Sequence, residues 1–272
     1  GGAKTRCPLW GKSREAGKGV HLPRSGCSAQ GSRQKAQGKR LKARDSIHRR
    51  AKLLYPIILR RYIMTNEYIF SHVDHTLLKA TATWEEIRKL CEEAEKYHMA
   101  AVCIPSSFVR KVREEFPGLT ICTVVGFPLG NCSTEAKTQE AITAISDGAD
   151  EIDMVIHIGA LKAGNLTYVT GEIAEMKAAI EDHILKVIVE TCYLTEKEKI
   201  AACRCVTEGG ADYIKTSTGF GGQGANLGDV NLFRNYVGQD VKFKSARRTH
   251  TRGEMVSSLE AGDPRLGAIA GI

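Results

Sequence analysis

Residues 211–220 read Ala-Asp-Tyr-Ile-Lys-Thr-Ser-Thr-Gly-Phe, a short apolar strand followed by a glycine-rich turn. Lys215 lies inside the apolar run. Burying an unpaired ammonium group costs several kcal/mol, so a lysine in such a run is either held neutral or given a charge partner. Because a neutral amine attacks carbonyl carbon and forms a Schiff base, Lys215 is a candidate nucleophile. The alternative is a strand-end lysine whose ammonium group reaches water.

Two further stretches place ionisable groups in strands. Residues 150–156 (Asp-Glu-Ile-Asp-Met-Val-Ile) contain Asp153, and residues 241–246 (Val-Lys-Phe-Lys-Ser-Ala) contain Lys242 and Lys244. A second cation near Lys215 favours the neutral amine by like-charge repulsion, and Asp153 is then suited to proton transfer. Since alternate residues of a strand share a face, the pattern alone does not choose between Lys242 and Lys244.

From residue 66 onward, strand-like apolar runs alternate with helical stretches. Thr83 with Glu86, and Thr195 with Glu198, predict capping boxes at the starts of two helices. The expected helices are residues 84–98, 107–115, 133–147, 168–181, 196–208, 226–237 and 255–261. The expected strands are residues 69–73, 100–104, 119–125, 151–156, 185–191, 211–216, 241–245 and 265–270. This order predicts a (β/α)8 TIM barrel with its site at the C-terminal ends of the strands. Because the sequence stops at Ile272, we expect the barrel to lack its last helix.

The charge of the chain is unevenly distributed. The formal net charge is +8, but residues 1–63 alone hold 17 Lys and Arg against 2 acids, which leaves −7 for residues 64–272. A segment so basic and so poor in apolar residues does not offset its ordering entropy. We therefore expect residues 1–63 to be a disordered basic leader, such as translated upstream sequence, and the barrel domain to span residues 64–272. A nucleic-acid-binding arm and an organelle-targeting leader are the alternatives.

The remaining composition argues against several classes of site. The nine cysteines form no CxxC pair, and His72, His75 and His157 have no metal-ligand spacing, so no metal site is expected. This cysteine usage suits a reducing compartment and indicates a cytoplasmic protein. No apolar run approaches the length of a membrane-spanning helix, so no membrane partner is expected.

Four stretches in order carry a family resemblance. They are residues 73–79 (Val-Asp-His-Thr-Leu-Leu-Lys), 124–130 (Val-Val-Gly-Phe-Pro-Leu-Gly), 151–155 (Glu-Ile-Asp-Met-Val) and 213–220 (Tyr-Ile-Lys-Thr-Ser-Thr-Gly-Phe). From about Asn66 to its end, the sequence resembles the deoxyribose-phosphate aldolases. The resemblance implies reversible cleavage of 2-deoxy-D-ribose 5-phosphate to D-glyceraldehyde 3-phosphate and acetaldehyde, in deoxyribonucleotide catabolism and without a cofactor. A homodimer is one assembly to consider.

The resemblance also implies roles for individual residues. Lys215 would form the Schiff base, Lys244 would be the second lysine, and Asp153 would transfer protons. The residues expected to bind substrate are Asp74, Cys103, Thr218, Gly219 and Gly267. Three simpler roles stay open: Asp153 as a structural ion-pair partner, Asp74 as a cap of the turn at Thr76, and Cys103 as a packed small hydrophobe. A transaldolase-like enzyme would fit the Lys215 stretch alone, but the other three stretches argue against it.

The sequence departs from the family pattern at the phosphate-binding positions. Arg247 and Arg248 replace a glycine pair, and Ile269 stands where the family has a phosphate-binding serine. Backbone N–H groups of paired glycines approach a phosphate closely, whereas arginine side chains take up that space. We therefore expect an impaired phosphate site, unless the guanidinium groups bind the phosphate themselves. The alternative is an inactive or poorly folded aldolase remnant.

Overall fold

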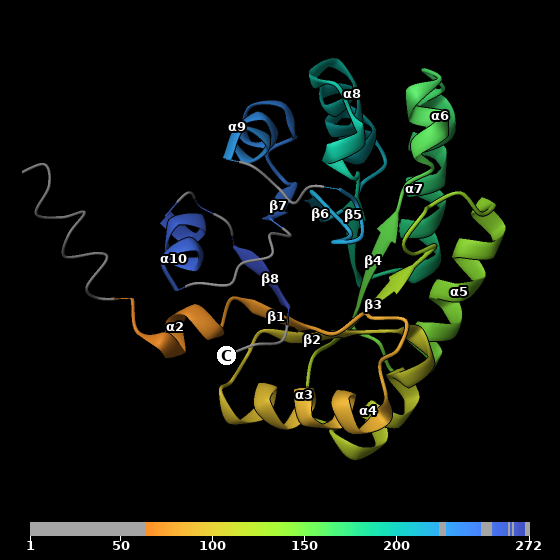
Figure 1. Cartoon of the computed structure of the whole chain (residues 1–272). Helices are drawn as coiled ribbons and strands as arrows, with labels where there is room; N and C mark the ends of the chain where they lie inside the picture. Colours follow the sequence, from red (N-terminus) through yellow and green to blue (C-terminus); the bar gives the residue numbers. More distant parts are fainter. Residues whose placement is uncertain (1–63, 223–226, 246–251, 261, 263, 270–272) are drawn as a thin grey trace, which may run out of the picture. The chain divides into compact units, whose positions relative to one another are not determined.

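Eight parallel strands close into a barrel in the computed structural model, which describes residues 64–222, 227–245, 252–260, 262 and 264–269 (Figure 1). Each strand pairs with its neighbours in sequence, and the last strand pairs with the first. The strands are β1 (Val73–Thr76), β2 (Ala101–Ile104), β3 (Ile121–Val125), β4 (Glu151–Val155), β5 (Ile184–Ile188), β6 (Tyr213–Lys215), β7 (Lys242–Ser245) and β8 (Arg265–Ile269). The predicted TIM barrel is confirmed. The expected leader, residues 1–63, lies outside the described residues.

Helices follow the strands along the chain. Both predicted capping boxes are present, with Thr83 and Thr195 each accepting a hydrogen bond from the backbone of the glutamate three residues later. The helices are α2 (Asn66–Phe70), α3 (Trp84–Lys96), α4 (Val109–Glu115), α5 (Thr134–Ser146), α6 (Ile158–Lys162), α7 (Leu166–Ile180), α8 (Glu196–Glu208), α9 (Leu227–Tyr236) and α10 (Arg252–Glu260). Two short 3₁₀ turns lie at Ser106–Phe108 and Thr191–Tyr193. None of the helices in the described part of the chain is long and apolar enough to span a bilayer.

The start of the first strand differs from the prediction. Ile69 was expected to open a strand, but it lies in helix α2, and β1 begins only at Val73. The Thr65 hydroxyl accepts a hydrogen bond from the N–H of Tyr68 and so caps this short helix. Ile69 is buried within the helix. Because a short apolar run is buried equally well as a helix or as a strand, its pattern does not separate the two.

Alternation along the strands produces two separate apolar layers. In β4, Ile152 and Met154 belong to the large core that the strands share with the surrounding helices. A second, small cluster is formed by Ala101, Cys103, Cys122 and Val124 of β2 and β3. Since successive residues of a strand face opposite sides, Glu151 and Asp153 face away from the large core and into the barrel. The barrel interior therefore receives the ionisable side chains.

A fully buried ion pair joins α5 to α7 outside the barrel. The Lys137 ammonium group lies 2.6 Å from Glu172, and both side chains have no exposed surface. Lys137 also donates to the carbonyl oxygen of Val155 over 2.8 Å. The second carboxylate oxygen of Glu172 accepts a hydrogen bond of 3.0 Å from the N–H of His157. The pair thus holds the chain where it leaves β4, the strand that carries Asp153.

Candidate active site

Three lysines converge on one carboxylate inside the barrel. The Asp153 carboxylate lies 2.6 Å from the Lys215 amine nitrogen, 3.2 Å from that of Lys244 and 2.7 Å from that of Lys186. The strand register explains the convergence, because Asp153 is paired with Lys186 across β4 and β5, and Lys215 with Lys244 across β6 and β7. Only 3% of Lys215 is exposed, so its amine is directed at Asp153 and not at bulk water.

The structure shows which of the two lysines of β7, Lys242 or Lys244, points into the barrel. Lys244 is buried, contacts Asp153 and forms a close ion pair with Asp74 of β1. Lys242 is exposed, and its amine lies over the ring of Tyr213, 5.6 Å from the ring centroid. Of the two lysines on β7, Lys244 is therefore the one that reaches the cluster around Asp153.

A second group of charges extends the cluster, and sequence reasoning missed it. Lys186 also lies 2.6 Å from Glu151, and Arg265 of β8 pairs with Glu151 and lies 3.4 Å from Asp74. The signal for Lys186 was present, because this lysine interrupts the apolar strand 184–188 just as Lys215 interrupts its own strand. Glu151 and Arg265 are the first residues of their strands. A charged residue at the start of a strand usually faces solvent, so the sequence pattern did not mark them as buried.

The cluster carries one more positive than negative formal charge. Its acids are Asp74, Glu151 and Asp153, and its bases are Lys186, Lys215, Lys244 and Arg265. Among the described residues, Lys186 and Lys244 each contact at least two of these carboxylates, whereas Lys215 contacts only Asp153. Lys215 is therefore the lysine with the fewest contacts to negative charge.

Burial and charge act in opposite directions on the central groups. Burial alone would raise the pKa of Asp153, but the ammonium groups of Lys186, Lys215 and Lys244 outweigh it and hold that pKa well below its usual range. Burial likewise opposes the charge on Lys244, yet Asp153 and Asp74 raise the pKa of its amine. For Asp74, too, burial would raise the pKa, but nearby cations, Lys244 foremost, lower it below its usual value. The Asp153 carboxylate and the Lys244 ammonium are therefore both charged at neutral pH.

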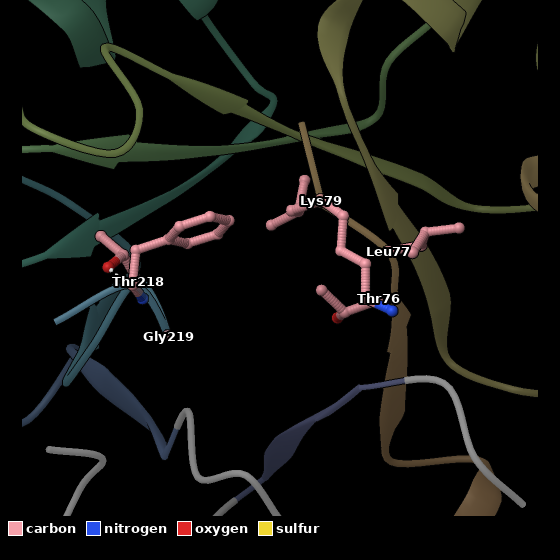
Figure 2. A pocket seen from close by; sticks show the side chains of 7 residues that line it. Thr76, Leu77, Lys79, Thr218 and Gly219 are labelled. Atoms are coloured by element: carbon pink, nitrogen blue, oxygen red, sulfur yellow. Dashed lines mark hydrogen bonds between the residues drawn. The ribbon is translucent and has the colours of Figure 1, made fainter. Parts of the chain in front are cut away.

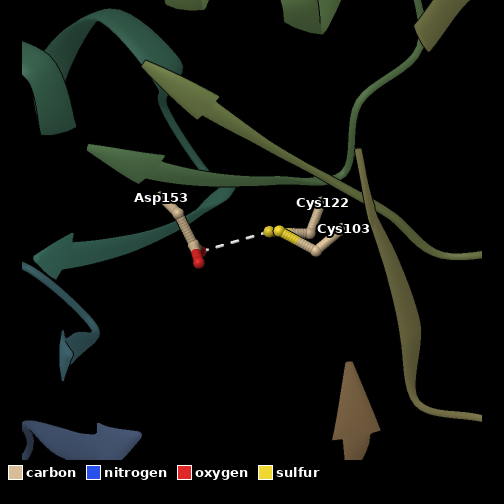
Figure 3. Close-up of side chains that lie close together, drawn as sticks. All are labelled: Cys103, Cys122 and Asp153. Carbon is tan, nitrogen blue, oxygen red and sulfur yellow. Dashed lines mark hydrogen bonds between the residues drawn. The ribbon is translucent and has the colours of Figure 1, made fainter. Parts of the chain in front are cut away.

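Two thiols border the same carboxylate. Cys103 and Cys122 are register partners on β2 and β3, and Figure 3 shows their sulfur atoms together on the side of Asp153. Cys122 donates to Asp153 over 3.1 Å, and a hydrogen bond with Cys122 lowers the pKa of the Cys103 thiol. These three side chains have the donor atoms of a site for a thiophilic metal. The Lys186 ammonium, however, lies 3.1 Å from the Cys122 sulfur and already supplies the positive charge there.

A cavity of about 340 Å³ opens between the ends of β1 and β6 (Figure 2). Its walls are Thr76, Leu77, Leu78 and Lys79 on one side and Thr218, Gly219 and Phe220 on the other. Thr218 and Gly219, which were expected to contact substrate, therefore face this opening. Gly219 has a φ of +88°, a conformation that residues with a Cβ rarely adopt.

The other predicted substrate-binding residues, Asp74, Cys103 and Gly267, do not line this cavity. Asp74 is fully buried, and its carboxylate pairs with Lys244. In the turn, the Thr76 hydroxyl donates to the backbone carbonyl oxygen of Asp74, so the Asp74 side chain does not cap the turn. Cys103 is buried in the small interior cluster. Gly267 of β8 is the register partner of Asp74. The predicted phosphate-site changes Arg247, Arg248 and the side chain of Ile269 fall outside the described residues.

Comparison with known proteins gives consistent matches. The family model described as DeoC/LacD family aldolase matches residues 69–244. The chain is 51% identical over 205 residues to the deoxyribose-phosphate aldolase of Clostridium botulinum strain Alaska E43, an alignment that covers 75% of this chain and 93% of that protein. Among solved structures, QR15, an aldolase, is 34% identical with a TM-score of 0.71 and covers 74% of this chain and 90% of its own. The tetrameric deoxyribose phosphate aldolase of Aeropyrum pernix is 28% identical with a TM-score of 0.68, covering 75% of this chain and 87% of its own.

Proposed function

Because the chain belongs to the deoxyribose-phosphate aldolases of the DeoC/LacD family, we propose that it cleaves 2-deoxy-D-ribose 5-phosphate through a Schiff base on Lys215. The observation that carries this proposal is the contact between the Lys215 amine and Asp153, 2.6 Å apart in a buried cluster. A buried amine that lies near a second ammonium group, and that contacts a single carboxylate among the described residues, is suited to attack a carbonyl group at the C-terminal end of a barrel strand.

The reaction consists of bond changes that the cluster can support. The amine of Lys215 adds to the aldehyde carbon C1 of the open-chain sugar, and loss of water leaves an iminium group. The C3 hydroxyl then gives up its proton, the C2–C3 bond breaks, and C3 leaves as the aldehyde of glyceraldehyde 3-phosphate. The electron pair of the broken bond forms an enamine between C1 and C2. Protonation of C2 and addition of water release acetaldehyde and restore the amine.

Proton transfer in these steps is assigned to Asp153 and Lys244. One oxygen of Asp153 contacts both the Lys215 and the Lys244 nitrogen, so it offers a short path between the reacting nitrogen and a charged amine. Because its pKa is lowered, Asp153 is ionised before the reaction and takes up a proton from the reacting groups only transiently, while the neighbouring ammonium supplies one. Asp74 supports this by holding Lys244 in the barrel.

The phosphate end and the assembly are part of the same proposal. Arg247, Arg248 and Ile269 at the family's phosphate positions would reduce the advantage of the phosphorylated sugar over free deoxyribose. The aldolase activity belongs to residues 64–272 and not to the basic leader. By analogy with the tetrameric relative from Aeropyrum pernix, the chain forms a homo-oligomer. It works in deoxyribonucleotide catabolism in the cytoplasm.

Borohydride trapping tests the proposal directly. The full chain is incubated with acetaldehyde, reduced, digested and examined by mass spectrometry. The expected adduct is on Lys215, absent in Lys215→Ala and retained in Lys242→Ala, a matched control because Lys242 is an exposed lysine on the neighbouring strand. A folded protein that forms no adduct on Lys215 would refute the proposal and support the aldolase remnant.

A further inference from the structure

Glu190 is a buried acid that the reaction above does not use. It lies two residues after the end of β5, and only 1% of its surface is exposed. Its backbone is in the left-handed region, with φ of 51° and ψ of 68°. A residue with a Cβ is strained there, and such strain persists where the surrounding structure fixes it and often where function needs it. Among the described residues, Glu190 forms no ion pair.

The Glu190 carboxylate is instead held by the loop that follows Lys215. One of its oxygens accepts hydrogen bonds from both the N–H and the hydroxyl of Thr218, the first over 3.0 Å. The same hydroxyl accepts a bond of 3.0 Å from the N–H of Phe220. A chain of hydrogen bonds therefore runs from Glu190 through Thr218 to Phe220.

Close packing fixes the other side of the carboxylate. Cys192 donates to the second oxygen of Glu190 over 3.6 Å. A Cβ on Gly221 would lie 3.0 Å from that oxygen and 2.7 Å from the Cys192 sulfur, so only glycine lets the loop pack this tightly. The strand ends are also joined by the backbone, since the N–H of Val189 donates to the carbonyl oxygen of Lys215. The position of Glu190 thus determines the position of the loop.

This loop forms one wall of the cavity at the barrel mouth. Thr218, Gly219 and Phe220 face Thr76 to Lys79 across the opening (Figure 2). Lys215 ends β6, and the wall begins three residues further along the chain. A five-carbon sugar joined to Lys215 has three more carbons than acetaldehyde, so it reaches further from the amine towards this wall. The wall therefore matters for the longer substrate.

We propose that Glu190 is a positioning residue: its carboxylate fixes the wall formed by Thr218 to Phe220 and thereby aligns the hydroxyl-bearing part of the sugar for cleavage at Lys215. This inference rests on the proposed aldolase function. Glu190 acts through Thr218 and does not itself touch the substrate.

The test compares two substitutions at one position. In Glu190→Gln, the amide oxygen can still accept both bonds from Thr218, because both go to the same oxygen. In Glu190→Leu, a side chain of similar size accepts neither. We expect Glu190→Gln to keep kcat/KM for 2-deoxyribose 5-phosphate within about threefold, and Glu190→Leu to lower it about 100-fold, the usual effect of a misplaced substrate. The rate of acetaldehyde trapping on Lys215 should stay within about twofold in both variants, since that step needs no wall.

A second variant covers the case in which Glu190→Leu does not fold. Gly221→Ala removes no polar group and displaces Glu190 through the added Cβ. It should therefore also lower kcat/KM for sugar cleavage while leaving the rate of acetaldehyde trapping on Lys215 unchanged. Equal kcat/KM in wild type and a folded Glu190→Leu would overturn the inference alone, as would a parallel loss of cleavage and trapping. A folded wild type that does not cleave the sugar would overturn the proposed function, and the inference with it.

Discussion

Replacement of Lys137 by methionine should destabilise the protein without touching the reacting groups. The substitution leaves the Glu172 carboxylate fully buried with the N–H of His157 as its remaining hydrogen-bond donor, and it removes the donor to the Val155 carbonyl oxygen. Breaking a buried ion pair by removing one partner costs about 3–5 kcal/mol. Methionine has a similar length, so it still fills the space beside Gly126, where the lysine stem packs.

The double variant Lys137→Met with Glu172→Gln separates the effect of the unpaired buried carboxylate from the effect of the changed side-chain shape. It leaves no buried charge, and the glutamine oxygen still accepts from the N–H of His157. The losses that remain belong to neutral groups, the Val155 carbonyl oxygen without its Lys137 donor and the amide N–H2 introduced at position 172, and together they cost about 1–3 kcal/mol. The double variant should therefore be about 2 kcal/mol more stable than Lys137→Met alone.

Equilibrium urea unfolding at pH 7 measures these differences through the midpoint at constant slope. The expected order of stability is wild type, then the double variant, then Lys137→Met. A single variant within about 1 kcal/mol of wild type would show that Glu172 is protonated or hydrated in place, and the reasoning would fail. It would fail equally if the double variant were no more stable than the single one.

Three further predictions follow from the cluster, the thiols and the phosphate positions. Asp153 and Asp74 have lowered pKa values, so their contribution to stability is complete above the unfolded-state value of about 4 and is lost as pH falls through the lower folded-state values. Urea midpoints should thus decline below about pH 4, more shallowly in Asp153→Asn, and an equally steep decline in that variant would contradict this. Burial raises the pKa of Cys91 and Cys203 to about 12, so a thiol reagent at pH 8 should modify the half-buried Cys132 and Cys192 first among the described cysteines. Peptide mapping checks the order, and early modification of Cys203 would disprove it. Substituting Arg247→Gly together with Arg248→Gly should raise kcat/KM mainly for the phosphorylated sugar, and equal gains on free deoxyribose would count against an impaired phosphate site.

The barrel was predictable because its strands are short apolar runs separated by capped helices. The error at Ile69 arose where the apolar run was too short to distinguish a helix from a strand. Lys215, Asp153 and Lys244, which the resemblance assigned to one reaction, do lie together, since inward positions of parallel strands share one interior.

Other parts of the site depend on tertiary structure. The sequence does show Lys186 inside an apolar strand, but its contacts with Glu151 and Asp153 come from the barrel. The choice of Lys244 over Lys242 depends on how β7 meets β6 and β8, which the alternation of one strand does not contain. Glu190 depends on a left-handed backbone conformation that its local sequence does not signal.

The ion pairs inside the barrel also determine when the chain finishes folding. Asp74 lies on the first strand, whereas Lys244, with which it pairs, lies 170 residues later in the chain. Arg265, which also contacts Asp74, lies on the last strand. During synthesis, which proceeds from the N-terminus, Asp74 and Glu151 emerge well before these cations. Lys186 of β5 supplies part of their electrostatic support earlier, but the remainder is gained only when the last two strands are in place, so closure of the ring is a late event with high contact order. A nascent chain that ends before β7 lacks two cationic partners of these acids and leaves β1 and β6 as unpaired edges, a feature that makes partly folded chains prone to aggregate.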